Sequence, residues 1–85
     1  MEAFVFINTH GGRAEGVFKA LGELKHPGGS FTHLSMLEGP FDIVGRVEGP
    51  NSRALCNLLT EGIRRIEGVA GTTTCLHTGN IYRAE

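Results

Sequence analysis

Hydrophobic residues follow two different spacings along the chain, and each change of spacing marks a new element. Residues 3–9 read AFVFINT, a short apolar segment rich in aromatic and β-branched residues, and the sequence HGG follows it. A segment of this kind predicts a strand. Apolar residues then recur at every third or fourth position, which predicts an amphipathic helix: Ala14, Val17, Phe18, Leu21 and Leu24. The sequence HPGG at residues 26–29 ends this helix.

Two further strands are predicted in the middle of the chain, at residues 31–38 and 41–48. Gly39-Pro40 lies between them and predicts a tight hairpin turn. A second helix follows, with a buried face marked by apolar residues at helical spacing: Leu55, Leu58, Leu59, Ile63 and Ile66. Asn51 or Ser52 is its N-cap.

Gly68 ends the second helix, and the threonine-rich residues 69–78 predict a last strand. The order of elements is therefore βαβ followed by βαβ. That order is typical of an α+β, ferredoxin-like sandwich, a four-stranded antiparallel sheet with two helices on one face. Right-handed crossovers place the first and third strands in the centre of the sheet and the second and fourth at its edges.

The central strands do not alternate between apolar and polar residues, although helices on one face predict such alternation. In the first strand, Phe4 and Phe6 point to one side while Val5 and Ile7 point to the other. In the third strand, Ile43 and Val44 likewise point to opposite sides. Because both faces need cover and the chain predicts no third layer, we expect a homo-oligomer, at least a dimer packed sheet to sheet.

Composition and charge narrow the function. The 85 residues make one domain, and eight Lys and Arg against nine Asp and Glu give a net charge of −1. No basic surface for nucleic acid is expected. The first residues contain only five consecutive apolar positions, which is too few for a membrane span. Cys56 and Cys75 lack CxxC spacing and are read as reduced, mostly buried thiols of a cytoplasmic protein.

Three segments in order resemble a known family: GPFDIVGRVEG from Gly39, NSRALCNLLTEGIRRIEGV from Asn51, and TTTCL from Thr72. Together they resemble the ligand-binding domain of the leucine-responsive regulatory protein/AsnC transcription factors, also called the RAM domain, for regulation of amino-acid metabolism. The resemblance covers nearly the whole chain. Family regulators carry a helix-turn-helix domain ahead of this unit, whereas here the first strand starts at residue 3. Residues 1–85 are therefore expected to be a single RAM-like domain without a helix-turn-helix.

The resemblance implies a ligand site. In the family a small effector, usually a free amino acid, lies between neighbouring dimers of a ring-like assembly. Carried over to this chain, the contacts are Gly39, Phe41 and Asp42 from the turn and Thr72 and Thr74 from the last strand. A carboxylate suits the ammonium group of an amino acid, and hydroxyls suit its carboxylate, through charge-assisted hydrogen bonds.

Each of these residues also has an ordinary structural interpretation. Asp42 after a Gly-Pro turn can form a hydrogen bond with its own backbone in an Asx-turn. Gly39 can be present only because the turn needs a residue with a positive φ. Phe41 can belong to the core. Thr72 and Thr74 are residues that β-propensity alone places on an edge strand.

No catalytic, cofactor or metal site is predicted. The glycine-rich residues 10–16 lack the spacings of nucleotide-binding loops. His10, His26, His33 and His77 show no ligand spacing within one subunit, and a site between subunits stays open.

We therefore expect a small-molecule binding and oligomerisation domain with a regulatory role in amino-acid metabolism or transcription. Its partners are a free amino acid or similar metabolite, further copies of itself and full-length family regulators. One alternative is a small enzyme of the dimeric α+β barrel type, for which His33 and His77 are the candidate acid/base residues. The other alternative is a pure assembly module.

Overall fold

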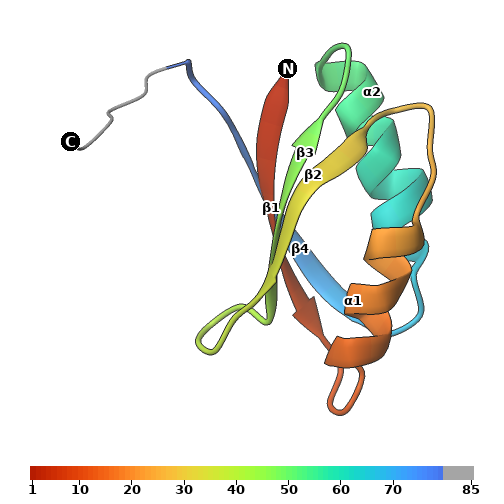
Figure 1. Cartoon of the computed structure of the whole chain (residues 1–85), viewed down its shortest axis with the longest axis vertical. Helices are drawn as coiled ribbons and strands as arrows, with labels where there is room; N and C mark the ends of the chain where they lie inside the picture. The colour runs from red at the N-terminus through yellow and green to blue at the C-terminus, as the bar shows by residue number, and fades with distance from the viewer. Residues whose placement is uncertain (80–85) are drawn as a thin grey trace.

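The computed structural model describes residues 1–79 and contains one four-stranded antiparallel sheet with the strand order β2-β3-β1-β4. The strands are β1 (Glu2–Thr9), β2 (Ser30–Met36), β3 (Ile43–Glu48) and β4 (Val69–Leu76). The helices are α1 (Ala14–Glu23) and α2 (Ser52–Asn57), and both lie on the same side of the sheet (Figure 1). The ferredoxin-like α+β fold and the central position of the first and third strands are confirmed.

The core lies between the helices and one face of the central strands. In the pairing of β1 with β3, Ala3 lies opposite Val47, Val5 opposite Gly45 and Ile7 opposite Ile43. Strand residues two apart share a face, so these side chains form one continuous layer. The buried hydrophobic residues are Ala3, Val5, Ile7, Val17, Leu21, Ile43, Val47, Leu55, Leu58 and Ile63. Five of these residues had been marked by helical spacing in the sequence: Val17, Leu21, Leu55, Leu58 and Ile63.

The second helix begins at Asn51, whose Oδ1 accepts a hydrogen bond of 2.8 Å from the backbone N–H of Ala54. Asn51, and not Ser52, is therefore the N-cap. The regular α-helix is short, because a π-helical turn (Leu58–Gly62) and a 3₁₀ turn (Ile63–Arg65) continue it. The sequence did not predict this change of winding.

The connection between β2 and β3 is longer than the tight turn predicted at Gly39-Pro40. Residues 37–42 form a loop between paired Met36 and Ile43, and the N–H of Leu37 closes it by donating to the carbonyl of Asp42 at 2.8 Å. A two-residue type I′ turn needs a positive φ at both central positions, and proline fixes φ near about −65°. Pro40 therefore excludes that turn.

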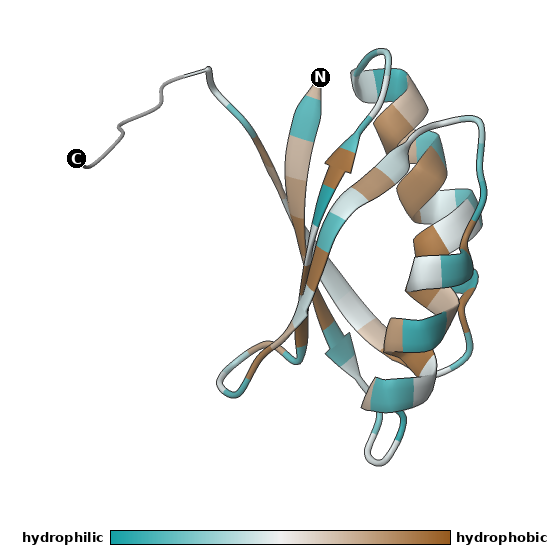
Figure 2. Ribbon diagram, in the orientation of Figure 1, coloured by the Kyte–Doolittle hydropathy of each residue, from teal (hydrophilic) through white to brown (hydrophobic). Residues whose placement is uncertain are grey.

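The opposite face of the sheet has no cover within the described residues and is called the open face below (Figure 1). Phe6 and Val44, which pair across β1 and β3, are half-buried there, and Phe4 is 37% exposed. Figure 2 shows hydrophobic residues along the strands as well as on the helices. The two-sided pattern of the central strands is thus confirmed, while the oligomer inferred from it stays a prediction.

Two glycines provide a matched test of packing between the 26–29 segment and α2. A Cβ at Gly28 would lie 2.2 Å from the carbonyl oxygen of Ala54, whereas a Cβ at Gly22 in α1 meets nothing within 4 Å. We expect Gly28→Ala to lower the free energy of unfolding by about 1–3 kcal/mol through overpacking. Gly22→Ala should raise it by about 1 kcal/mol through helix propensity. Urea unfolding measures both, and equal effects would contradict the packing described here.

Candidate functional site

The side chain of Asp42 is bonded to the end of the neighbouring strand and not to its own loop. Its carboxylate oxygen Oδ2 accepts a 2.7 Å hydrogen bond from the backbone N–H of Thr9 and a 3.1 Å bond from the Thr9 hydroxyl. Both bonds are partly buried. The Asx-turn interpretation therefore does not describe this residue, which instead joins the loop of residues 37–42 to β1.

The backbone of Asp42 strengthens the same junction. Its N–H donates to the carbonyl of Ile7 at 3.0 Å, and its carbonyl accepts from Leu37 at 2.8 Å. The pairing of β1 with β3 therefore continues one residue beyond Ile43. Within residues 1–79, the second carboxylate oxygen of Asp42, Oδ1, carries no hydrogen bond. The side chain is thus oriented through one oxygen while the other is available.

Phe41 packs against an aromatic ring of the open face. Its ring centroid lies 5.1 Å from that of Phe6, with an angle of 42° between the ring planes. Phe41 is half-buried and lies outside the core, so the interpretation as a core residue is not confirmed. In Figure 1 the loop between β2 and β3 projects to the side of the sheet opposite the helices.

Gly39 serves the conformation of this loop. Its φ is 150°, a backbone angle that residues other than glycine rarely adopt. A Cβ at this position would meet no atom within 4 Å. The requirement for glycine is therefore one of backbone conformation and not of space. Gly39, Phe41 and Asp42 lie together in one short loop, whereas the sequence analysis had placed the start of a strand at residue 41.

Thr72 and Thr74 lie on the other side of the sheet from Phe6 and Phe41. Thr72 pairs with Ile7 and Thr74 with Val5, so both threonines share the helix-covered face with these buried residues. Thr74 lines a groove of about 290 Å³ between α2 and β4, together with Ser52, Leu55, Cys56, Leu59 and Leu76. Within one chain the structure therefore does not bring the threonines to the loop.

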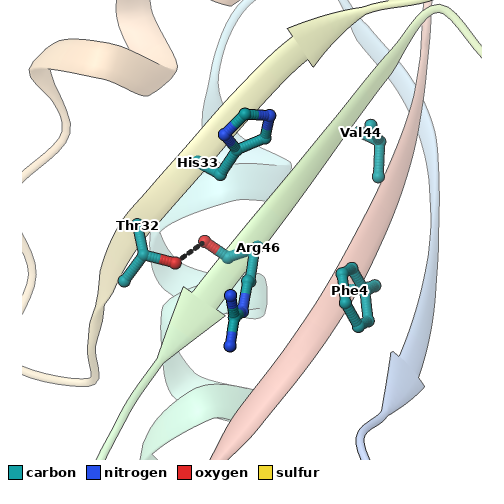
Figure 3. Close-up of a pocket in the computed structure, with 5 residues that line it drawn as sticks. All are labelled: Phe4, Thr32, His33, Val44 and Arg46. Carbon is teal, nitrogen blue, oxygen red and sulfur yellow. Dashed lines mark hydrogen bonds between the residues drawn. The ribbon is translucent and has the colours of Figure 1, made fainter. Parts of the chain in front are cut away.

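The open face carries a hollow that the sequence did not predict (Figure 3). It has a volume of about 350 Å³ and is lined by Phe4, Thr32, His33, Val44 and Arg46, from β1, β2 and β3. Arg46 forms an ion pair with Glu2. His33 Nε2 lies 2.9 Å from Ser35 Oγ, and the Thr32 hydroxyl donates to the carbonyl of Arg46 at 3.3 Å. Alternation along residues 43–48 was the available signal, since it places Arg46 beside Val44.

The remaining candidate residues are dispersed. Within residues 1–79, no group of three His, Cys, Asp or Glu side chains is arranged to hold a metal ion. His33 lies on the edge strand β2, and His77 follows the other edge strand, β4. Cys56 and Cys75 are free, as expected, but both are exposed. The expectation of buried thiols was wrong because Cys56 lines the open groove between α2 and β4, and Cys75 lies beside Phe4 on an edge strand. No helix in the same residues is long and apolar enough to cross a membrane.

Comparison with known proteins finds the same fold in other solved structures. No protein-family model and no curated protein matches the sequence. Among solved structures, TTHA0845 from Thermus thermophilus is 30% identical, with 96% of this chain and 98% of that chain covered and a TM-score of 0.83. AsnC from E. coli is 21% identical, with 99% of this chain and 55% of that chain covered and a TM-score of 0.83.

The chain belongs to the leucine-responsive regulatory protein/AsnC family. It is similar to the family's RAM unit and spans about half the length of AsnC, but nearly all of TTHA0845. A third relative by structure is the transcriptional regulator NMB0573 from Neisseria meningitidis, solved as a complex with L-Met. It is 14% identical, with 94% of this chain and 52% of that chain covered and a TM-score of 0.73. NMB0573 and an AsnC family protein from Agrobacterium tumefaciens, which is 19% identical, are both named as transcriptional regulators.

Proposed function

We propose that this RAM domain binds a free amino acid, or a closely similar zwitterionic metabolite, and regulates amino-acid metabolism or transcription through assembly. The observation that carries the proposal is the carboxylate of Asp42, which Thr9 orients through Oδ2 while Oδ1 has no hydrogen bond within residues 1–79. An ammonium group at Oδ1 would make a charge-assisted hydrogen bond. Phe41, held against Phe6, provides an apolar surface beside it.

The two halves of the predicted site come from different copies of the chain in this proposal. Within one chain the sheet separates Thr72 and Thr74 from the loop that contains Phe41 and Asp42. The threonines lie on β4, an edge strand, where a neighbouring copy can approach them. A site that uses Asp42 for the ammonium and these hydroxyls for the carboxylate therefore forms at a contact between copies, and ligand binding and assembly stabilise each other.

We further propose that two copies pack through their open faces. Phe4, Phe6 and Val44 present apolar surface there that the helices do not cover. At about 25 cal/mol per Å², burying this surface favours association. The ion pair of Glu2 with Arg46 contributes charges of both signs at the rim, which suits a self-complementary two-fold contact. The net charge of −1 supports a role without direct DNA contact for residues 1–85.

The ligand is tested by a thermal-shift screen of the purified protein against the twenty amino acids. A ligand present at 100 times its Kd should raise the free energy of unfolding by about 2.7 kcal/mol, which is visible as a shift of several degrees. Asp42→Asn is the informative variant, because its amide oxygen can still accept from Thr9 while the negative charge is lost. We expect this variant to fold and to lose the shift.

Asp42→Ala serves as the comparison in that screen. It removes the acceptor of both Thr9 bonds, so its unfolding free energy should fall by about 1–3 kcal/mol, in contrast to Asp42→Asn. A shift that persists in Asp42→Asn would remove this residue from the site. A screen without any hit, on a stable oligomer, would contradict the amino-acid proposal and favour a pure assembly module.

The dimer is tested by placing a charge on the open face. Val44→Glu should convert the assembly to a monomer, because a carboxylate in the sheet-to-sheet contact would lose its hydration while Arg46 on the same face is already paired with Glu2. Asn57→Glu, an exposed position on α2 with the same change of charge, is the control and should leave the mass unchanged. Light scattering during size-exclusion chromatography measures both, and an unchanged mass for Val44→Glu would exclude the open face as the contact.

A further inference from the structure

His26 connects the segment between α1 and β2 to the second helix. Its side chain is only 16% exposed. Nδ1 accepts a 2.8 Å hydrogen bond from the backbone N–H of Gly28, and Nε2 lies 3.1 Å from Oε1 of Glu61 in the π-helical turn. One imidazole therefore holds two parts of the chain that are 35 residues apart.

These two contacts define the proton on the ring. A backbone N–H can only donate, so Nδ1 must be unprotonated to accept from Gly28. The ring proton then lies on Nε2 and is donated to the carboxylate of Glu61. A second proton on Nδ1 would point toward the N–H of Gly28 and remove that hydrogen bond. The same proton would strengthen the contact with Glu61, because the bond would then join opposite charges.

The segment that His26 holds is packed directly on backbone atoms. A Cβ at Gly28 would lie 2.2 Å from the carbonyl oxygen of Ala54 and 3.1 Å from the nitrogen of Leu58. Leu58 is the residue at which α2 passes into the π-helical turn. Residues 26–29 therefore contact α2 where its winding changes, and a change at His26 acts on that contact.

We propose that the hydrogen bond between His26 Nδ1 and the N–H of Gly28 is a proton-operated latch of the turn at residues 26–29, which the contact of His26 with Glu61 keeps beside the second helix. When neutral, the imidazole binds Gly28 and Glu61 together; when protonated, it releases Gly28 and keeps Glu61. Histidine is the side chain that ordinarily changes charge between about pH 5 and 8. Glu61 is the charged side chain in contact with the ring within residues 1–79, while Glu48 reaches the segment through its carbonyl oxygen, which a Cβ at Gly29 would approach to 2.4 Å.

Release of the latch bears on the open face. Residues 26–29 lead directly into β2, which carries Thr32 and His33 of the hollow. The expected effect is a local loosening of this segment at acidic pH. Global unfolding is not required. The protonated ring loses its hydrogen bond with Gly28, but its hydrogen bond with Glu61 becomes stronger.

The latch is tested by two-dimensional NMR of the whole chain between pH 8 and 5. We expect the amide signal of Gly28 to shift in step with the ring signals of His26. Its protection factor against hydrogen exchange should fall about tenfold, as for the loss of one hydrogen bond. A Gly28 amide that stays constant while the His26 ring titrates would overturn the proposal.

Two variants separate the latch from a general effect of pH. In His26→Asn the side-chain oxygen can accept the same N–H two residues on, as in an Asx-turn, and does not titrate. The Gly28 signal should then stay constant across the range. His10→Asn removes a different, exposed histidine and should leave the transition of Gly28 unchanged. A transition that persists in His26→Asn, or one that disappears in His10→Asn, would also overturn the proposal.

Discussion

The structure depends on two central strands with apolar side chains on both of their faces. The helices cover one face, where Val5, Ile7 and Ile43 are fully buried. Across the sheet, Phe4 is partly exposed and Val44 is half-buried. A chain of this size has one layer of helices and therefore one covered face. Burial of the apolar side chains on the open face provides the driving force for the proposed assembly. Assembly in turn determines which residues can share a ligand site.

The junction of Asp42 with Thr9 connects the sheet to the proposed function. Two hydrogen bonds to Oδ2 fix the carboxylate before any ligand arrives. A group held in advance loses less conformational freedom on binding, which favours affinity. Thr9 also belongs to β1, so the loop of residues 37–42 is anchored on the strand that pairs with β4. The candidate ligand loop is therefore part of the sheet's own hydrogen bonding.

The periodic parts of the fold were predictable, and the parts that depend on register were not. Right-handed crossovers gave the strand order, and helical spacing gave the buried residues of the two helical segments. The tight turn predicted at Gly39-Pro40 was wrong, since a loop of residues 37–42 connects the two strands and Pro40 is incompatible with a type I′ turn. The faces of Thr72 and Thr74 follow from their pairing with Ile7 and Val5. A shift of one residue reverses every face, and the sequence alone does not fix that register.

Long-range contacts explain the rest of what the sequence did not show. Asp42 meets Thr9 across 33 residues, and His26 meets Glu61 across 35 residues. No local motif encodes such pairs. Asp42 was identified only because its loop resembles a family motif, whereas the hollow containing Arg46 was not among the site residues that the resemblance implied.

The central claim is that one amino-acid site draws Asp42 from one copy and the threonines from another. The most direct measurement mixes two inactive variants, Asp42→Asn and Thr72→Val/Thr74→Val, after joint unfolding and refolding, and measures amino-acid binding by calorimetry. In the mixed assembly some sites contain a native loop from one copy and native threonines from another. We predict that binding returns in the mixture while each variant alone stays inactive. A mixture as inactive as its components would contradict a site shared between copies.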